Sequence, residues 1–330
     1  MRTLQSNDVR VTLTGTQDGR TSILVEPLRD VFIPFSRWVT SYPHSLIEKE
    51  LDIFGPYLID DIRRDEDPDY VEKELRNNIF LHMPDETFAG KRLLDFGCGS
   101  GASAMILSRM FPEIGEIVGV ELVARHLEVA RARARYYGFD NISFKLSPAA
   151  NRLPDDLGEF DVVMLSAVFE HLLPSERRPL LELLWSAMKP GAVLFINQTP
   201  NRWFPVEIHT TGGIPGLNFL PKPAVEWIAK RFSDQVREEQ SWEDLLRAGI
   251  RGGSEREIMA LLPGDAERLL PPGIRDGIDI WYKRTRNRSS LKKRVAYAGF
   301  KAIAATGLVM LPYHLNMAIR KLPGRAAIGW

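Results

Sequence analysis

The 330-residue sequence predicts an α/β fold in which a mostly parallel central sheet carries helices on both faces. Three observations support this prediction. Short apolar runs alternate with amphipathic segments between residues 92 and 196, a pattern typical of parallel sheets. A glycine-rich turn joins the first apolar run to the first amphipathic segment. The run at 160–166 is apolar enough for a strand buried in a parallel sheet.

The elements of the predicted sheet follow in order along the chain. A strand at 93–96 precedes a helix at 102–111, and a strand at 117–121 precedes a helix at 125–137. Gly138 suits the end of that second helix, because glycine adopts the left-handed conformation common there. The later elements are strand 142–146, strand 160–166, helix 177–188, a Lys189-Pro190-Gly191 stop, and strand 192–196.

The flanking regions predict further elements and four segments. Alternating residues at 9–13 and 21–25 predict a hairpin, and helices are expected at 45–58 and 68–83. After the sheet we expect helices at 222–232, 241–250 and 254–262 and a last strand at 278–282. The predicted segments are an N-terminal cover at 1–85, a ligand-binding core at 86–200, a substrate-side loop, lid and closing strand at 201–282, and a basic, apolar C-terminal tail at 283–330.

Composition narrows the class of protein. Cys98 is the one cysteine, which excludes an intramolecular disulfide framework and suits a reducing compartment. Residues 1–15 are polar, unlike the apolar centre of a signal peptide. These observations together predict a cytoplasmic protein. The sequence leaves the oligomeric state open.

The C-terminal tail has an unusual charge pattern. Residues 280–330 hold eleven Lys or Arg and no Asp or Glu, although the whole chain has a net charge of zero. Such an imbalance predicts an anionic partner for the tail, or docking of the tail on the acidic remainder of the chain.

Between its basic residues, the tail contains an apolar run at 295–315 that is interrupted by Lys301 and Pro312. A spanning helix needs about 20 apolar residues, so the run better suits a helix lying in a membrane interface. We therefore predict peripheral contact with anionic headgroups on the inner face of the membrane. The alternative, a helix packed on this chain or on a second subunit, stays open.

The glycine turn is the most informative motif. Gly97, Gly99 and Gly101 follow Asp95 in a G-x-G-x-G pattern, with Cys98 inside the turn. Glycines let a ligand approach the backbone, and the helix start supplies free N–H groups. Dinucleotide-binding folds usually carry G-x-G-x-x-G instead, so this spacing disfavours an NAD-dependent oxidoreductase.

Taken with Asp95 and Cys98, the glycine string resembles the first motif of class I S-adenosylmethionine (SAM) methyltransferases. The resemblance implies a Rossmann-like fold with SAM as cofactor. It places the turn of Gly97, Cys98, Gly99 and Gly101 against the amino-acid part and ribose of SAM, and Asp95 near the methionine amino group. The Lys189-Pro190-Gly191 stop before an apolar strand is similar to a second recurring feature of this family.

Further cofactor contacts are expected beyond the turn. Glu121 lies 20 residues after Gly101 at the end of a predicted strand, close to the spacing at which an acid meets ribose hydroxyls. The alternative for Glu121 is a strand end at the surface. We also expect Leu122, Ala149 and Ser166 to contact the cofactor.

The chain departs from its relatives after the third predicted strand. Many family members place an Asp there to read the adenine amino group, whereas this chain has Ser147-Pro148-Ala149-Ala150-Asn151. The adenine contact is then left to backbone groups near Ala149 or to the Asn151 amide.

Four residues are candidates for the chemical step. Glu170 and His171 follow the strand at 160–166, and ligands in open α/β sheets bind outside the carboxyl ends of strands. Glu207 and His209 lie in the long loop after the strand at 192–196. That loop resembles the "T-P-N-R…H-T" segment of a subset of bacterial SAM methyltransferases, many of them associated with glycan or lipid pathways.

Two roles compete for these four residues. A general base would remove the acceptor proton, and histidine suits that task near neutral pH; His171 is the first choice and His209 the second. The other role is a divalent metal site, which is not favoured. Some ubiquinone-pathway and small-RNA methyltransferases of this class carry E-x-x-E-H here and bind a divalent ion. This chain has Ala167 in place of the first Glu, so Glu207 or His209 would have to supply the missing ligand. A third reading is that Glu170 and His171 only brace the following helix.

The sequence therefore predicts a SAM-dependent methyltransferase that O-methylates a hydroxyl on a small acceptor, lipid-like or glycan-containing. Two alternatives stay open: an RNA methyltransferase whose basic tail follows phosphates, and a SAM-fold binding protein without turnover. No recognisable RNA-binding module is present, which makes RNA the less favoured partner.

Overall fold

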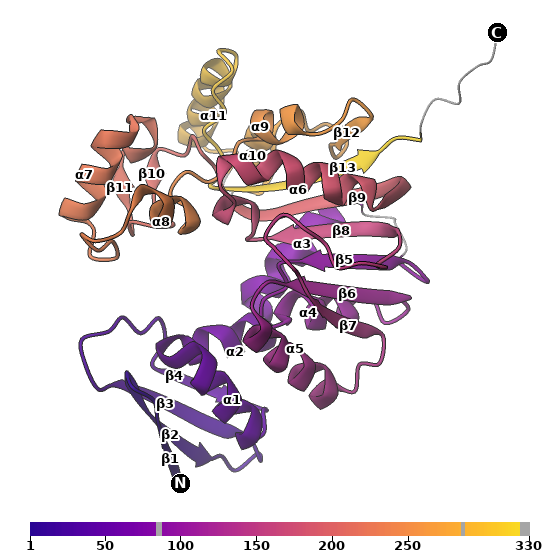
Figure 1. Ribbon diagram of the computed structural model, residues 1–330. Helices are drawn as coiled ribbons and strands as arrows, with labels where there is room; N and C mark the ends of the chain where they lie inside the picture. The colour runs from indigo at the N-terminus through magenta and orange to yellow at the C-terminus, as the bar shows by residue number, and fades with distance from the viewer. Residues whose placement is uncertain (84–87, 285–287, 324–330) are drawn as a thin grey trace. The chain divides into compact units, whose positions relative to one another are not determined.

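The computed structural model describes residues 1–83, 88–284 and 288–323. The chain forms two compact units, the first made of residues 1–77, 87–149 and 153–157 and the second of residues 78–86, 150–152 and 158–330. The predicted fold class is confirmed, because the structure is mixed α/β with mostly parallel core strands (Figure 1). The predicted boundary at residue 85 and the tail positions 285–287 and 324–330 lie outside the described residues.

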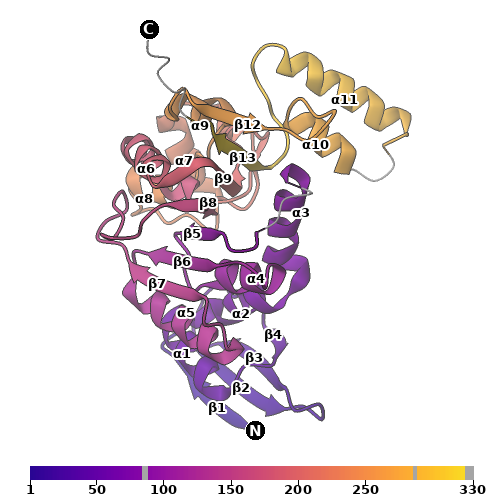
Figure 2. The same cartoon turned by 90° about the vertical axis from the view of Figure 1, so that its right-hand side faces the viewer.

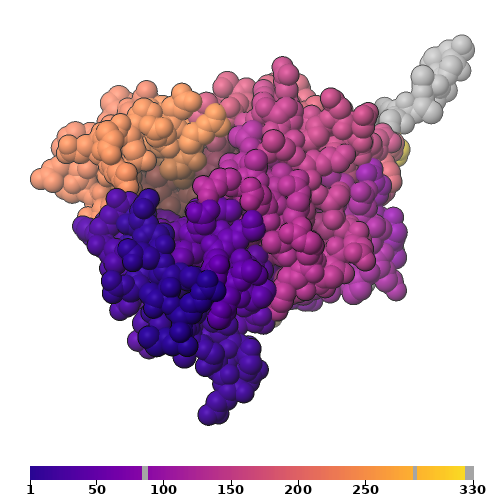
Figure 3. Space-filling model, turned by 60° about the horizontal axis from the view of Figure 1, so that its bottom comes forward, coloured from indigo at the N-terminus to yellow at the C-terminus, as the bar shows by residue number. Residues whose placement is uncertain are grey.

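The first unit opens with an antiparallel sheet packed on two helices. The sheet has the order β1-β2-β3-β4, and it includes the predicted hairpin. Its buried side chains Val9, Val11 and Ile23 form one core with Ile47 of α1. Figure 3 shows the indigo and violet residues of this N-terminal part as one continuous surface. The elements are β1 (Arg2–Gln5), β2 (Val9–Gly15), β3 (Thr21–Pro27), β4 (Arg37–Thr40), α1 (His44–Phe54), a 3₁₀ turn (Gly55–Tyr57), α2 (Leu58–Glu66) and a π-turn (Pro68–Glu72). Helix α3 (Lys73–His82) begins in the first unit and ends in the second.

Three parallel strands complete the first unit in the order β5-β6-β7. Helices α4 and α5 connect these strands and pack along them (Figures 1 and 2). Gly138 ends α5 in the left-handed conformation, as its position after the helical pattern predicts. The elements are β5 (Arg92–Phe96), α4 (Ala102–Met110), β6 (Glu116–Glu121), α5 (Ala124–Tyr137) and β7 (Ile142–Leu146).

The second unit contains four paired strands in the order β12-β13-β9-β8, of which β8 and β9 run parallel. Strand β13 is antiparallel to both of its neighbours, β9 and β12. The elements are β8 (Phe160–Ser166), a 3₁₀ turn (Phe169–His171), α6 (Pro174–Ser186), β9 (Met188–Pro200), β10 (Val206–Glu207), β11 (Ile214–Pro215), a 3₁₀ turn (Leu217–Phe219), α7 (Lys222–Phe232), α8 (Trp242–Arg247), α9 (Glu255–Leu261), β12 (Ala266–Leu269), α10 (Gly277–Arg284), α11 (Leu291–Ala304) and β13 (His314–Lys321).

Two sequence predictions in this unit are wrong. Lys189, Pro190 and Gly191 begin β9 rather than end a helix, and the pairing register with β8 shifts beside them. Residues 278–282 are helical, not a strand. The Asp276 carboxylate accepts the N–H groups of Ile278 and Asp279 and so caps α10, while Asp279 accepts the N–H of Arg275 in return.

The C-terminal tail is a helix and a strand rather than one interfacial helix over 295–315. Helix α11 ends at Ala304, and Leu315 is buried in β13. The sheet of the second unit therefore extends beyond the predicted core at 86–200. None of the described helices has the length and hydropathy needed to cross a membrane.

Candidate active site

The glycine turn between β5 and α4 is shaped for close approach of a ligand. Gly97, Gly99 and Gly101 all have positive φ angles, of 72°, 53° and 82°. A Cβ on Gly101 would lie 2.9 Å from the Cβ of Ala130 in α5, so only glycine lets α5 pack here. A Cβ on Gly99 would meet nothing within 4 Å, which leaves open space over the backbone.

Asp95, at the end of β5, lies beside this turn and is buried. Its Oδ2 accepts a 2.6 Å hydrogen bond from the Ser103 hydroxyl, whereas Oδ1 has no partner among the described residues. Burial, together with the Glu121 charge, raises the pKa of Asp95 to about 6. A buried carboxylate with one unpaired oxygen fits a cationic ligand group such as the methionine ammonium of SAM.

Glu121 ends β6 and is tied to the turn. Its Oε2 accepts the N–H of Gly99 at 2.9 Å, and its Oε1 accepts the N–H groups of Leu122 and Val123. These bonds show that the carboxylate orders the turn, and its remaining lone pairs suit ribose hydroxyls. The Leu122 side chain beside it is 50% exposed, an apolar surface next to the turn.

Cys98 and Ala149 are two further predicted cofactor contacts. Cys98 is buried inside the glycine turn, whereas Ala149 lies in the segment after β7. Cys98 is buried, and burial raises the pKa of its thiol well above the usual value, which suits packing rather than nucleophilic chemistry. The Ala149 carbonyl accepts a hydrogen bond from the Ser147 hydroxyl at 2.9 Å. The N–H of Ser147 in turn donates to the Glu121 carbonyl, so the segment after β7 is fixed beside β6.

A buried ionic network around Arg133 stabilises the glycine turn through Ser100. Sequence patterns do not reveal this network. Arg133 of α5 is fully buried and donates to the Ser100 hydroxyl at 2.7 Å and carbonyl at 3.2 Å. The same guanidinium pairs with Asp61 of α2 at 2.7 Å and with Glu50 of α1 at 3.0 Å. Ser100 also donates to Asp61, so the N-terminal helices and the glycine turn share one set of hydrogen bonds.

The second unit carries the other predicted residues, starting at the end of β8. Ser166 ends the strand, and its buried hydroxyl has no hydrogen-bond partner among the described residues. Ala167 follows with a φ of 55°, a strained conformation for a residue other than glycine. The chain then enters the 3₁₀ turn that carries Glu170 and His171.

Glu170, His171 and His209 form one cluster, in which a ligand atom from each lies within 4.8 Å of the others. The Glu170 carboxylate accepts a hydrogen bond from Thr199 at 3.0 Å, and its other oxygen lies 3.9 Å from His171 Nε2. Burial raises the pKa of Glu170 to about 7. Gly249 is required beside the cluster, because a Cβ there would lie 2.7 Å from the His209 ring.

The His171 ring is oriented by a backbone group. Its Nδ1 lies 2.6 Å from the Arg247 carbonyl, which can only accept a hydrogen bond. Nδ1 therefore carries the proton, and Nε2 is the nitrogen with a lone pair. Arg247 is itself fixed by a bidentate ion pair with Glu176, both bonds being 2.6 Å. Nothing in the sequence pattern pointed to Arg247, whereas Thr199 is the first residue of the T-P-N-R segment.

Glu207 lies outside this cluster. Its buried carboxylate accepts the N–H groups of Thr210 and Thr211, so it orders the turn that carries His209. Its remaining capacity for a metal or an acceptor proton is small. The structure therefore brings together three of the four predicted residues and gives the fourth a supporting contact.

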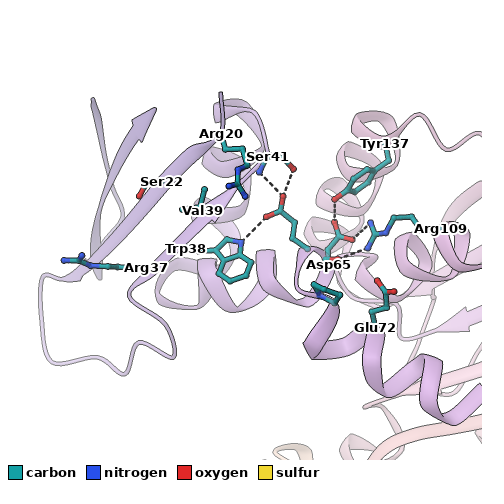
Figure 4. A pocket seen from close by; sticks show the side chains of 12 residues that line it. Arg20, Ser22, Arg37, Trp38, Val39, Ser41, Asp65, Glu72, Arg109 and Tyr137 are labelled. Carbon is teal, nitrogen blue, oxygen red and sulfur yellow. Dashed lines mark hydrogen bonds and ion pairs between the residues drawn. The ribbon is translucent and has the colours of Figure 1, made fainter. Parts of the chain in front are cut away.

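A separate open pocket of about 1000 Å³ lies in the first unit (Figure 4). The start of β3, strand β4, the end of α2 with the π-turn after it, and the far ends of α4 and α5 line it. Its acidic groups are already paired: Glu66 with Trp38 and Ser41, Asp65 with Arg109 and Tyr137, and Glu72 with Arg76. Arg109 is eight residues along α4 from Gly101, about 12 Å at the usual helical rise, so this pocket is not the glycine turn.

Comparisons with known proteins agree with the interpretation of the glycine turn as part of a methyltransferase domain. Residues 93–191 match the family described as "Methyltransferase domain". The chain is 26% identical over 181 residues to a ubiquinone biosynthesis O-methyltransferase of Acinetobacter baylyi, covering 53% of this chain and 71% of the relative. It is 27% identical over 187 residues to the Ruegeria pomeroyi protein of the same name, covering 55% and 69%.

Among solved structures, the plantazolicin methyltransferase BamL, in complex with a triazolic desmethyl-plantazolicin analogue and SAH, is similar with a TM-score of 0.45 and 16% identity. That match covers 85% of this chain and 96% of BamL. The family match spans the glycine turn, Glu121 and the Glu170–His171 pair. It also includes Asp95, whose buried Oδ1 has no partner within the described part of the chain and lies where the SAM ammonium is expected. Residues 93–191 are therefore a methyltransferase domain of the class I SAM-dependent type, and SAM is the cofactor of this domain.

Proposed function

We propose that the protein transfers the methyl group of SAM to a hydroxyl oxygen on a small acceptor that is lipid-like or glycan-containing. The observation that supports this proposal is the orientation of His171, whose Nδ1 proton is held by the Arg247 carbonyl so that Nε2 keeps its lone pair. The curated relatives named for O-methylation in ubiquinone biosynthesis support a hydroxyl acceptor.

The proposed step uses the chain's residues for alignment and proton transfer. Bound SAM supplies an electrophilic methyl group, so a carbon–oxygen bond forms as the sulfur–carbon bond breaks. The hydroxyl proton passes to His171 Nε2, a transfer that typically contributes about 10²–10⁴-fold to the rate. His209 is the second choice for the base. Glu170 lies 3.9 Å from the His171 ring, so its negative charge would stabilise the imidazolium that forms.

The proposed cofactor contacts are of two main kinds: contacts from the carboxylates of Asp95 and Glu121, and contacts from backbone groups. Asp95 binds the ammonium, the turn of Gly97, Cys98, Gly99 and Gly101 contacts the amino-acid part and ribose, and Glu121 accepts from the ribose. Leu122 would cover the adenine face, and backbone near Ala149 would read its edge. Ser166, whose hydroxyl has no partner in the described ranges, is proposed to contact the cofactor at the end of β8.

The first experiment follows the methyl label. Methyl-labelled SAM is incubated with the protein and a cell extract, which is then separated into organic-soluble, small aqueous and RNA fractions. Label in the organic or small aqueous fraction is expected, whereas label confined to RNA would overturn the small-acceptor proposal.

The role of His171 is tested with His171→Ala, using His44→Ala on the exposed start of α1 as the control. The His171 variant should lose at least 100-fold in turnover while its affinity for SAM stays within about twofold. Unchanged turnover would exclude His171 as the base, and the same loss in His209→Ala alone would assign the role to His209.

A divalent metal at the same cluster is the second candidate, favoured by one observation. One carboxylate oxygen and two imidazole nitrogens within 4.8 Å form a ligand set that suits Mn²⁺, Fe²⁺ or Zn²⁺. Metal-free protein is titrated calorimetrically with each ion, beside Glu170→Gln and His209→Ala. Saturable binding that both variants weaken, with turnover lost on chelation, would favour the metal; turnover that survives chelation would exclude it.

A further inference from the structure

Among the described residues, the polar and ring contacts that join helix α11 to α10 come from one face of α11. The Tyr297 hydroxyl donates to Asp279 of α10 at 2.7 Å, and Lys301 lies 2.8 Å from both Asp276 and Asp279. Phe300 packs edge-on against Trp281 of α10. Polar and aromatic groups therefore hold this helix, and Figures 1 and 2 show that it projects away from β9 and β13.

The opposite face of α11 is apolar and exposed. Leu291, Val295, Ala298 and Ala302 follow one another at helical spacing and form a row that we call the outward stripe. Leu291 is 75% exposed and Val295 is 62% exposed. No residue of α11 is buried. A helix in a water-soluble protein normally turns its apolar stripe toward the core, so this arrangement is inverted.

Cations flank the outward stripe. At 100° per residue, Lys292 lies on one side of the stripe and Arg294 on the other, and both are exposed. Lys283, Arg284 and Arg288 precede the helix and are also exposed. The acids nearest to the helix, Asp276 and Asp279, are already paired with Lys301 on the inner face. The outer face of α11 thus combines apolar and positive groups without a carboxylate.

We propose that α11 lies flat on an anionic phospholipid bilayer, with the outward stripe in the interface and Lys292 and Arg294 against the headgroups. An apolar row between cations is the pattern of helices that bind in the plane of a membrane. A second copy of this chain is a poorer occupant, because it would bring a like-charged face against this one. The inference is independent of the acceptor and of the role proposed for His171.

Removing the tail would not test this inference. A chain that ended near Arg288 would also lose β13, which pairs with β9 and β12. Point variants on the outer face keep the sheet intact. Val295→Glu removes the largest exposed apolar side chain in the middle of the stripe, and Lys292→Glu with Arg294→Glu reverses the flanking charge.

The experiment is sedimentation of the full chain with phosphatidylglycerol/phosphatidylcholine vesicles at low ionic strength, beside vesicles of phosphatidylcholine alone. Trp227→Glu is the matched control, because Trp227 is 63% exposed on α7, outside α11. Wild type and Trp227→Glu should bind the anionic vesicles equally. Each reversed cation should weaken binding by at least about fivefold, and Val295→Glu should weaken it at least tenfold.

The outcomes separate the possible occupants. Binding lost at high salt and in both outer-face variants, with unchanged melting temperature and SAM affinity, supports the proposal. Wild-type protein that stays in the supernatant, or variants that bind as well as wild type, would overturn it. Sedimentation velocity without vesicles completes the test: a dimer that Val295→Glu dissociates would assign the stripe to a second copy instead.

Discussion

Asp95 carries a charge whose presence depends on pH near neutrality. Its pKa of about 6 means that the buried carboxyl is mostly protonated at pH 5 and mostly ionised at pH 7. If the carboxylate binds the SAM ammonium, affinity for SAM should rise about tenfold from pH 5 to pH 7. Calorimetric titration of SAM across this range measures the effect. Asp95→Asn should bind SAM weakly at both pH values, and a variant that kept the wild-type pH profile would contradict the assignment.

A second prediction at the residue scale concerns how the Glu170 carboxyl changes the free energy of unfolding with pH. The fold raises its pKa to about 7 from 4.5, so folding favours the protonated form. Its contribution to the free energy of unfolding is present below about pH 4.5 and is lost as pH rises toward 7. Glu170→Gln resembles the protonated residue. It should therefore match wild type at pH 5 and exceed it by about 2–3 kcal/mol at pH 8.

Urea unfolding at both pH values tests this prediction, because the difference between the two proteins cancels the titration of all other carboxyls. Equal stabilities at pH 8 would mean that the charged Glu170 is well solvated. The experiment is done on metal-free protein, since a bound cation would hold the carboxylate in its ionised form.

At the scale of elements, the Arg133 network connects three helices to the cofactor turn through one side chain. Ser100→Ala removes the hydroxyl that Arg133 and Asp61 share, while the Arg133–Asp61 and Arg133–Glu50 ion pairs remain. We expect the Kd for SAM to rise about threefold to tenfold, the cost of losing one or two such bonds. Thermal unfolding should show only a small loss of stability.

Ser108→Ala is the matched control for Ser100→Ala. Ser108 is a buried serine near the other end of α4 that donates to Asn141. If the network positions the turn, Ser108→Ala leaves the Kd for SAM unchanged. Equal losses of SAM affinity in both variants would mean that general loosening of α4, rather than positioning of the turn, causes the effect.

Most elements could be predicted from the sequence because their periodicity is local. The glycine turn, α4, β6, α5 and β7 follow directly from apolar spacing and the Gly138 stop. The failure at 278–282 is also local: five residues that mix Ile, Trp and Tyr fit strand or helix equally well. The Asp276 cap, which accepts the Asp279 N–H, and the Asp279 carboxylate, which accepts the Arg275 N–H, decide for the helix. Both acids were visible in the sequence.

At the scale of the whole chain, the sequence predicted candidate residues for the site. It did not predict the hydrogen bonds and ion pairs that position their side chains. Glu170 and His171 are adjacent, so their pairing was foreseeable, whereas His209 joins them through a loop turn that Glu207 orders. Arg133 and Arg247 sit in ordinary charged helical patterns, and burial or a backbone carbonyl gives them their roles. Contacts between residues 70 or more positions apart have no periodic signature.

The last prediction concerns strand β13. Its residues lie in the predicted C-terminal tail, but they form an inner strand of the sheet. It lies between β9 and β12, and Met317, Ala318 and Ile319 are buried in it. Fully burying each of the two larger side chains is worth about 1.5–3 kcal/mol, and the exposed edge of β9 would add to the loss. A chain that ends at Tyr313 should therefore lose much of a typical domain stability of 5–15 kcal/mol.

Thermal unfolding and SAM binding of two truncated chains test this role of β13. The chain ending at Tyr313 should be insoluble or melt without a cooperative transition, because β9 and β12 lose the strand that joins them. The chain ending at Pro323 keeps β13 to its last residue, Lys321, and should melt within about two degrees of the full chain. A stable, SAM-binding chain ending at Tyr313 would show that β13 is dispensable. The C-terminal segment would then be an appendage to the core, as its basic and apolar composition alone suggested.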